Sequence, residues 1–278
     1  MAALSFIKKY GLMLCLLFVV MACSSTASKK KLNQSKIYFG AGTQSLMTQD
    51  YTDALANLMK ANELDPENPG IVTNLAMAYY FKGEKNMAIK LLKKSIDLKE
   101  DNSDAKLNLA SIYFNDGDLK NAEKIYKSVL KDLTYDKQAR TLYNLGILEN
   151  RKNNQVAAMN YFKKSIKEDS SYCPSYYQIG LLKYQQKQYS ASLSNFRDAA
   201  MGTCMESPGA HYYQGLSLLG LKRYMEAQMK FDEIDARFKT SEFAAKARKK
   251  MTELIEIQKN DRTEEVHASR KMLESPDF

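Results

Sequence analysis

Apolar residues recur along this chain at helical spacing, and the pattern of large and small positions repeats every 34 residues. A small residue at position 8, a turn residue near position 15 and Ala at position 20 set the register, with Gly42 and Ala54 in the first copy. Six copies then cover residues 35–68, 69–102, 103–136, 139–172, 173–206 and 208–241. Each copy predicts two antiparallel helices, and large residues at positions 4, 7, 11, 17 and 24 are expected to fill the space between hairpins. Pro66, Pro69, Pro174 and Pro208 fall at copy boundaries, where proline is tolerated.

A final helix is expected after the last copy. Residues 242–258 carry apolar side chains at helical spacing, namely Phe243, Ala247, Met251, Leu254 and Ile255. We interpret this segment as a capping helix that covers the exposed face of the last hairpin. Residues 259–278 are charged and weakly patterned, which predicts a frayed or disordered tail.

The N-terminus has the features of an export signal. Lys8 and Lys9 precede an apolar run, residues 11–22, that is shorter than the ~20 residues of a membrane-spanning helix. The run ends in Val20-Met21-Ala22-Cys23, which resembles a bacterial lipobox and makes Cys23 the lipidated first residue after removal of residues 1–22. An ordinary secretory peptide or an uncleaved anchor are the alternatives. Cys15 is rejected as the lipidated residue because it follows the bulky Leu14 inside the run.

The residues after Cys23 predict a destination and a linker. In the best-known sorting rule Asp after the lipidated Cys retains a lipoprotein at the inner membrane, so Ser24 indicates the outer membrane. Residues 23–34 are small, polar and basic, and they predict a flexible tether.

The net charge and the distribution of lysines bear on whether nucleic acid is a partner. The formal charge of +9 falls to +7 when Lys8 and Lys9 leave with the signal. The remaining lysines are mixed with acidic residues and cluster only at Lys29 to Lys31, so a solvated surface is favoured over nucleic-acid binding.

Two cysteines remain after Cys15 and Cys23 are accounted for. Cys173 begins the first helix of copy 5 and Cys204 follows its second helix, and these ends lie side by side in an antiparallel hairpin. An oxidising compartment would permit a disulfide between them, whereas two buried free thiols are the alternative.

The repeating pattern resembles the tetratricopeptide repeat over about three quarters of the chain. The resemblance implies an all-α, right-handed superhelical solenoid of six hairpins plus the capping helix, with positions 2, 5, 9, 12 and 13 of each first helix along an inner groove. Positions 5, 9 and 12 are mostly apolar or aromatic here, so we expect a protein segment with apolar anchors as the partner. The candidate groove residues are Phe39, Tyr80, Phe114, Tyr143, Tyr177 and Tyr184. The alternative is that some of these rings only pack.

Catalytic chemistry is not evident. His211 takes a packing position and His267 lies in the charged tail, so the two histidines do not form a zinc site. Gly40-Ala41-Gly42 lacks the strand that precedes a phosphate loop. We therefore expect no enzyme activity, no cofactor, no metal and no small-molecule substrate.

The combination of lipobox, six repeats and terminal helix resembles the type IV pilus biogenesis lipoproteins of the PilF, PilW and Tgl type. The match is most specific from Lys131 to Gly146, which carries a two-residue insertion, Tyr135 before the fourth repeat and Asn144-Leu145-Gly146 inside its first helix. Phe238 to Phe243 also resembles the family's end of the sixth repeat. The resemblance implies a pilotin, a lipoprotein on the periplasmic side of the outer membrane that helps secretin subunits insert and oligomerise. It also implies that the first repeats contact the secretin.

A general envelope adaptor is the alternative function. Such a protein would scaffold peptidoglycan enzymes or take part in outer-membrane protein assembly. Tetratricopeptide lipoproteins of barrel assembly usually have about five repeats, and six are counted here. Whether a pilus, a type II system or another secretin is served stays open at this point.

Overall fold

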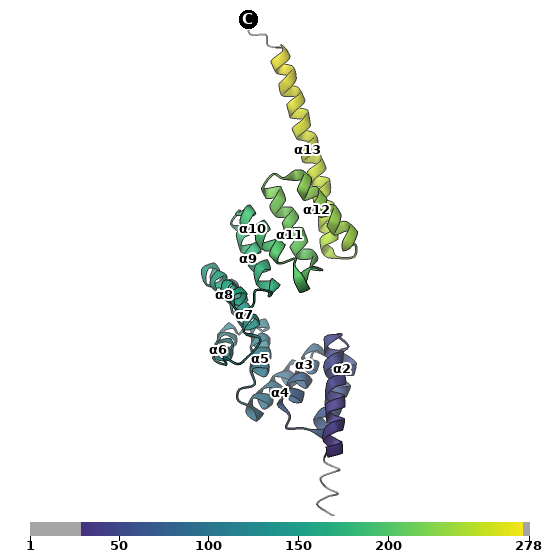
Figure 1. Cartoon of the computed structure of the whole chain (residues 1–278), viewed down its shortest axis with the longest axis vertical. Helices are drawn as coiled ribbons and strands as arrows, with labels where there is room; N and C mark the ends of the chain where they lie inside the picture. The colour runs from purple at the N-terminus through teal and green to yellow at the C-terminus, as the bar shows by residue number, and fades with distance from the viewer. Residues whose placement is uncertain (1–28, 275–278) are drawn as a thin grey trace, which may run out of the picture. The chain divides into compact units, whose positions relative to one another are not determined.

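The computed structural model describes residues 29–274, and all regular elements in this range are helices (Figure 1). A first helix, residues 29–47, precedes the labelled elements. These are α2 (Tyr51–Leu64), α3 (Pro69–Phe81), α4 (Lys85–Leu98), α5 (Ser103–Asn115), α6 (Leu119–Val129), α7 (Gln138–Arg151), α8 (Gln155–Glu168), α9 (Cys173–Gln185), α10 (Tyr189–Asp198), the 3-10 turn η1 (Gly202–Cys204), α11 (Pro208–Gly220), α12 (Tyr224–Arg237) and α13 (Glu242–Glu274). The expected signal peptide, residues 1–22, the expected lipidation residue Cys23 and Ser24 lie outside the described range. No described helix combines the length and the apolar character that a membrane span needs.

The helices pair into hairpins within two compact units, one ending at Tyr135 and the other beginning at Asp136. Unit 1 contains the first helix with α2, then α3 with α4, and α5 with α6. Unit 2 contains α7 with α8, α9 with α10, α11 with α12, and α13. The six hairpins coincide with the six sequence copies, and α3, α5, α9 and α11 begin at the first residue of their copies.

Position 15 explains how each hairpin turns. The backbone there has a positive φ in every copy, taken by Gln49, Gly83, Gly117, Asn153, Lys187 and Lys222. Glycine adopts this left-handed conformation without steric cost, and only two copies use it. The turn geometry therefore follows from the packing of the two helices and not from glycine alone.

Close contact within unit 1 is made by small residues on first helices and larger ones on second helices. A Cβ added at Gly42 would come within 2.6 Å of the Leu58 side chain, which is fully buried. A polar network adds to the apolar contacts, because Ser95 Oγ donates to the Pro69 carbonyl at 2.7 Å and lies 2.8 Å from Thr73 Oγ1. Asn102 Nδ2 donates to Ser95 Oγ at 2.8 Å, so the next hairpin joins the same network.

Unit 2 uses the same arrangement with larger rings. Phe162, Phe196 and Phe231 are fully buried on the second helices, and each lies directly against a glycine of its own hairpin: Gly146, Gly180 and Gly215. A fully buried Phe contributes about 1.5–3 kcal/mol of transfer free energy. The glycines are required because a methyl group there would overlap the ring, as at Gly215, whose added Cβ would lie 2.5 Å from Phe231.

The buried stripe of the first helices differs from the expectation. Position 10 is buried in copies 2 to 6, at Ala78, Ile112, Leu148, Leu182 and Ser217. The expected positions 4 and 11 are buried only in some copies: position 4 at Val72, Leu142 and His211, and position 11 at Glu149 and Leu218 but not at Tyr79 or Tyr113. The stripe therefore runs through positions 3, 7 and 10, a spacing of four and three residues that keeps one face toward the second helix.

Both ends of the helical region correct the sequence boundaries. Residues 29–34 are helical and exposed, although residues 23–34 were expected to form a flexible tether. They lack Gly and Pro, and the helix is fixed just after them, where buried Ser35 donates its hydroxyl to the Ala61 carbonyl at 3.0 Å.

The terminal helix is longer than expected. α13 continues to Glu274, so the residues expected to be a frayed tail from 259 onward are helical over most of their length. The segment has no Gly or Pro before Pro276, and most of its residues are helix formers. Ala247 and Leu254 are buried, but Ile255 is 58% exposed and does not belong to the capping face.

Candidate protein-binding surface

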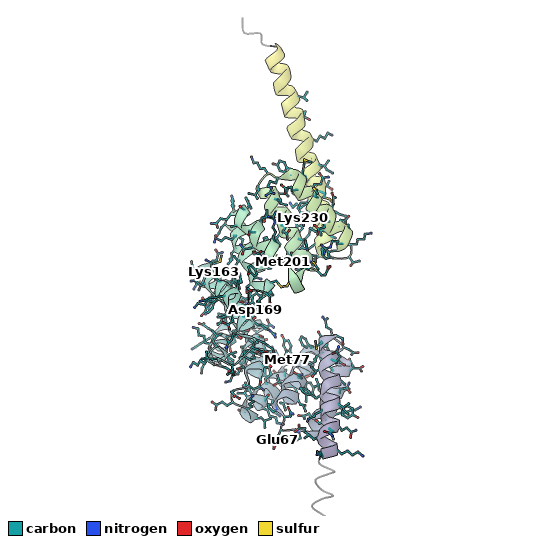
Figure 2. All side chains as sticks on the ribbon, viewed as in Figure 1. Glu67, Met77, Lys163, Asp169, Met201 and Lys230 are labelled. Carbon is teal, nitrogen blue, oxygen red and sulfur yellow. A yellow bond between two sulfur atoms is a disulfide. The ribbon has the colours of Figure 1, made fainter. Side chains whose placement is uncertain are left out.

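Positions 9 and 12 of the first helices, which we call the inner row, are half-buried in every hairpin. In unit 1 the inner row is Thr43, Leu46, Met77, Tyr80, Ser111 and Phe114, and in unit 2 it is Ile147, Asn150, Leu181, Tyr184, Leu216 and Leu219. Figure 2 labels Met77 among the side chains of α3. The same partial exposure in successive hairpins means that each unit keeps an accessible face with apolar side chains.

Position 5 behaves differently from the expectation. Phe39, Tyr143 and Tyr177 are half-buried, as a groove position requires. The same position is buried at Thr73, Leu107 and Tyr212, with at most 8% exposure. In those copies position 5 belongs to the core, and the interpretation of this position as groove lining is wrong there. Thr73 illustrates the reason, because its hydroxyl belongs to the network with Ser95.

The candidate rings of unit 1 pack on one side only. The Phe39 ring covers Gly70 of the next hairpin, with Cζ 3.5 Å from where a Cβ would stand. The Tyr80 hydroxyl accepts a hydrogen bond from Asn115 Nδ2 at 2.9 Å, and its ring meets Phe81 edge-on. Phe114 is half-buried. These rings are therefore oriented by neighbours and still have accessible surface.

The candidate rings of unit 2 each pack against other aromatic rings, and we call these rings together the aromatic cluster. Tyr143 packs edge-on against Tyr172 with centroids 5.6 Å apart. Tyr177 and Tyr184 both pack against Tyr213, at 6.0 and 5.8 Å. Sequence reasoning missed Tyr213, because position 6 was not among the groove positions and its partners come from other helices.

Burial keeps these tyrosines protonated. Desolvation raises the pKa of Tyr177 to about 12, and desolvation followed by the neighbouring Tyr143 raises the pKa of Tyr172 to about 12. Desolvation also raises the pKa of Tyr143 and Tyr184. At neutral pH these side chains are uncharged, so they offer apolar rings with hydroxyl groups that donate and accept hydrogen bonds.

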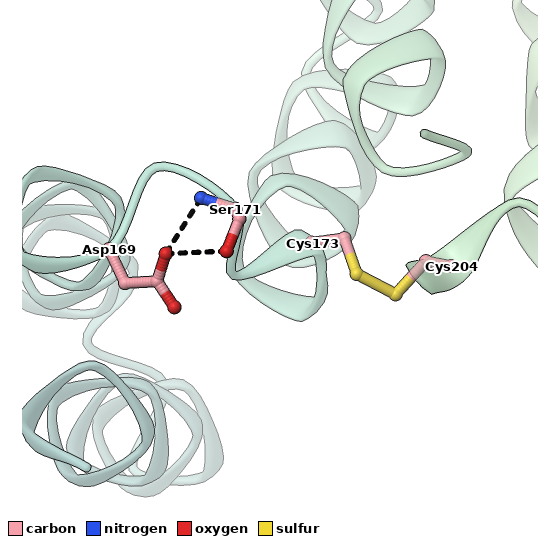
Figure 3. Close-up of a disulfide and its surroundings, with 4 residues drawn as sticks. All are labelled: Asp169, Ser171, Cys173 and Cys204. Carbon is pink, nitrogen blue, oxygen red and sulfur yellow. Dashed lines mark hydrogen bonds between the residues drawn. A yellow bond between two sulfur atoms is a disulfide. The ribbon is translucent and has the colours of Figure 1, made fainter. Parts of the chain in front are cut away.

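A cavity of about 280 Å³ lies in unit 2. We call it the disulfide pocket, because a disulfide between Cys173 and Cys204, with Cα atoms 6.3 Å apart, forms part of its wall (Figure 3). Its lining residues are Tyr143, Cys173, Pro174, Tyr177, Ala199, Cys204, Ser207, Pro208, Gly209 and Phe243. Two candidate groove residues, Tyr143 and Tyr177, therefore contribute to one apolar site together with the capping helix.

The turn before α9 places Cys173. The Asp169 carboxylate accepts hydrogen bonds from Ser171 N at 2.8 Å and Ser171 Oγ at 2.6 Å (Figure 3). The Ser171 hydroxyl and amide hold the pKa of Asp169 below its usual range. This closed turn ends two residues before Cys173 and fixes where α9 begins.

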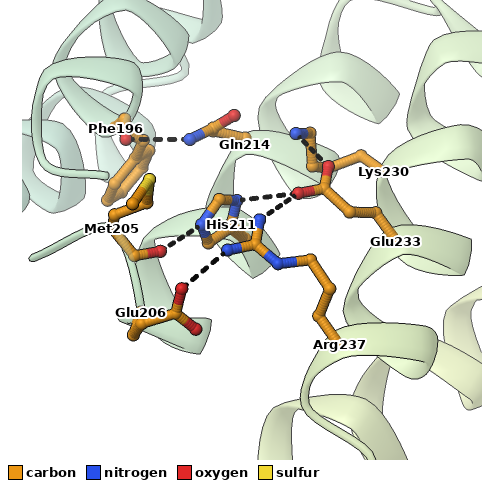
Figure 4. A network of polar contacts seen from close by, with 8 residues as sticks. All are labelled: Phe196, Met205, Glu206, His211, Gln214, Lys230, Glu233 and Arg237. Atoms are coloured by element: carbon orange, nitrogen blue, oxygen red, sulfur yellow. Dashed lines mark hydrogen bonds and ion pairs between the residues drawn. The ribbon is translucent and has the colours of Figure 1, made fainter. Parts of the chain in front are cut away.

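A polar network holds the loop between α10 and α11 from the other side (Figure 4). His211 is buried, and its Nε2 lies 2.9 Å from the Met205 carbonyl, which assigns the proton to Nε2. Arg237 bonds Glu206 at 3.1 Å and Glu233 at 2.7 Å. Burial acts to raise the pKa of Glu233, but hydrogen bonds from Lys230 and Arg237 outweigh it and hold this pKa below its usual range. The loop that carries Cys204 is thus fixed by the disulfide and by charged hydrogen bonds.

The half-buried rings and the disulfide pocket are suited to binding a segment of another protein. Among the described residues, no group of three His, Cys, Asp or Glu side chains is placed to hold a metal ion. The half-buried rings and the pocket can hold apolar side chains of another protein, and the hydroxyl groups can bond to its backbone. Cys23, the expected lipid-attachment residue, lies outside the described residues.

Comparison with known proteins supports the repeat fold. A sequence model of the tetratricopeptide repeat matches residues 86–145, and no curated protein matches the chain in sequence. Among solved structures, PilF of Pseudomonas aeruginosa aligns with a TM-score of 0.66 at 16% identity, over 80% of this chain and 99% of PilF.

Two further structures show the same likeness. PilW, a widely conserved type IV pilus biogenesis factor, aligns with a TM-score of 0.64 at 18% identity, over 76% of this chain and 97% of PilW. A chain of the APC/C Cut9–Hcn1 hetero-tetramer aligns with a TM-score of 0.67 at 17% identity, over 81% of this chain and 45% of its own length. At sequence identities of 16–18%, the likeness to these structures shows a shared fold and no more. The chain has the all-α tetratricopeptide fold, which is typically a non-catalytic protein-interaction scaffold, and it resembles the pilus biogenesis factors in structure.

Proposed function

We propose that this protein is a pilotin, a lipoprotein anchored in the outer membrane that assists assembly of a type IV pilus secretin. The observation that carries the proposal is the extent of the structural likeness. The chain matches 99% of PilF and 97% of PilW, whereas it matches under half of the Cut9–Hcn1 chain. The lipobox ending at Cys23 adds support, because a membrane anchor is what a secretin-assembly factor needs.

The proposed mechanism combines anchoring and temporary cover. Acyl chains on Cys23 hold the protein at the periplasmic face of the outer membrane, and more than one chain is needed for firm anchoring. The inner rows and the aromatic cluster bind an apolar segment of a secretin subunit. Neighbouring subunits then bury that segment as the multimer closes.

A deletion strain tests the proposal. We expect loss of secretin multimers from outer-membrane fractions and loss of surface pili, both restored by the wild-type gene. Cys23→Ala should give a protein that folds normally, incorporates no labelled fatty acid and assembles the secretin poorly. Normal secretin multimers in the deletion strain would reject the proposal. If defects in cell-wall enzymes or other outer-membrane proteins accompanied that result, the function would be that of an envelope adaptor.

A further inference from the structure

We propose that the disulfide pocket of unit 2 binds one aromatic side chain of a partner protein segment. This inference deepens the proposed function and rests on it for the identity of the partner, a secretin subunit. The site itself is argued from its size, its lining and the way its walls are held.

Size limits the occupant to one large side chain. The cavity measures about 280 Å³. A cavity of ~150 Å³ lined by apolar side chains accommodates benzene. The disulfide pocket therefore has room for a six-membered ring and part of the backbone that carries it, but it is smaller than most sites for drug-sized ligands.

The lining selects an uncharged, aromatic occupant. None of the ten lining residues is Lys, Arg, Asp or Glu, so a charged group would lose its hydration without compensation. Three of the lining residues are the aromatic Tyr143, Tyr177 and Phe243, and two are prolines. Aromatic pairs in edge-to-face or offset contact gain about 0.5–1.5 kcal/mol beyond the area they bury, so such a wall favours a ring over an aliphatic side chain of similar size.

One wall group remains available for bonding. The Tyr177 hydroxyl makes no hydrogen bond within the part of the chain that the structure describes, and the high pKa keeps it protonated. It lies 3.2 Å from where a Cβ of Gly209 would stand, so it packs closely against Gly209, another lining residue of the pocket. It can donate a hydrogen bond to a backbone carbonyl of an incoming segment.

The wall of the pocket that carries Cys204 is fixed in place. This wall belongs to the loop between α10 and α11. The disulfide at Cys204 and the His211 contact to the carbonyl of the adjacent Met205 both hold the part of that loop that precedes α11. A site that is already ordered loses little entropy when the partner binds.

A filling variant and a matched control provide the test. Ser207 lines the pocket, and its side chain makes no capping hydrogen bond. Ser207→Leu therefore adds volume inside the pocket without removing a stabilising contact. Ser194→Leu makes the same chemical change at an exposed site on α10. Tyr177→Phe removes only the hydroxyl.

The probes are N-acetyl-phenylalaninamide and N-acetyl-leucinamide, titrated into the full chain with its disulfide intact and followed by amide NMR shifts. We expect saturable shifts at Gly209 and Phe243, and about 2–12-fold tighter binding of the aromatic probe. Ser207→Leu should weaken binding at least about tenfold, which is the loss of one well-packed ring. Ser194→Leu should leave it unchanged, and Tyr177→Phe should weaken it about fivefold. Circular dichroism checks that each variant is folded.

The results separate this inference from the proposed function. No saturable shift at Gly209 and Phe243, equal binding of the leucine probe, or wild-type binding by Ser207→Leu would each overturn the pocket as an aromatic site. A change of the Gly209 and Phe243 signals when the protein is diluted without any probe would identify a second copy as the occupant and would also overturn the proposal. If the probe binds as expected while the deletion strain forms normal secretin multimers, the pocket stands and the pilotin function fails.

Discussion

Breaking the Cys173–Cys204 bond should destabilise unit 2 by a few kcal/mol. The bond closes a loop whose ends are 31 residues apart in sequence. In the chain-entropy model, a loop of that length contributes about 3.7 kcal/mol at 25 °C by restricting the unfolded chain. For a unit of this size, that loss corresponds to a fall in melting temperature of roughly 7–15 °C.

Urea unfolding of the oxidised protein, the reduced protein and the Cys173→Ala/Cys204→Ala variant provides the measurement. The reduced protein keeps both side chains, so its difference from the oxidised protein isolates the bond. The double variant should match it, apart from the small change at buried Cys173. Hydrogen exchange adds a location, because protection should fall in α9 to α11 and stay unchanged in α3 to α5. The reasoning is refuted if reduction changes the unfolding free energy by less than ~0.5 kcal/mol, or if protection falls equally in both units.

Three further predictions concern packing, titration and the inner row. Gly215→Ala should lower the unfolding free energy by about 1–3 kcal/mol, because the new methyl group would overlap the Phe231 ring. At Gly40 nothing lies within 4 Å of an added Cβ, so Gly40→Ala should raise the unfolding free energy by about 0.5–1 kcal/mol. If urea unfolding gives changes of the same sign for Gly215→Ala and Gly40→Ala, the packing argument is wrong. Because burial raises the pKa of Tyr177 from 10 to about 12, its contribution to stability is complete below pH 10 and is lost as the pH rises toward 12. Stability measured against pH should therefore fall less steeply above pH 10 in Tyr177→Phe, and an unchanged slope would show that this residue is not the cause. Tyr80→Ala should lower the free energy of unfolding by less than the ~3–5 kcal/mol that truncation of a buried aromatic side chain costs, and it should weaken secretin assembly. A loss of ~3–5 kcal/mol with normal secretin multimers would show that Tyr80 belongs to the core.

The fold class could be predicted from the sequence because the 34-residue pattern is repeated, and each copy constrains the others. The prediction of an all-α tetratricopeptide fold is confirmed. The predictions for the two ends of the helical region were wrong because the 34-residue pattern does not extend to them. At residues 29–34 and beyond 259, composition suggested disorder, but the absence of Gly and Pro let existing helices continue.

The candidate site was predictable only where it depends on one repeat. Tyr143 and Tyr177 could be named because position 5 recurs. Tyr213 and Phe243 could not, because their partners lie on other hairpins or on the capping helix. At Thr73 the repeat pattern was misleading. This residue also occupies position 5, but it is buried in the core, where its hydroxyl contacts Ser95 in a polar network that the repeat pattern does not predict.

The contact between positions 8 and 24 of each copy has a consequence for how this sequence can change over time. In all six copies a small residue at position 8 is combined with a large buried one at position 24, and the glycine pairs are in direct contact. The pairs are Gly42 and Leu58, Ala76 and Leu92, Ala110 and Tyr126, Gly146 and Phe162, Gly180 and Phe196, and Gly215 and Phe231. In unit 2, where each pair is a glycine and a phenylalanine, a single substitution at either position is unfavourable. A methyl group added at the glycine would overlap the phenylalanine ring, and a smaller side chain in place of the phenylalanine would leave a cavity. Substitutions at these two positions should therefore be epistatic: each is harmful alone and tolerated together. In related sequences the two positions should covary within a repeat, and a repeat should be exchangeable between proteins only as a whole hairpin.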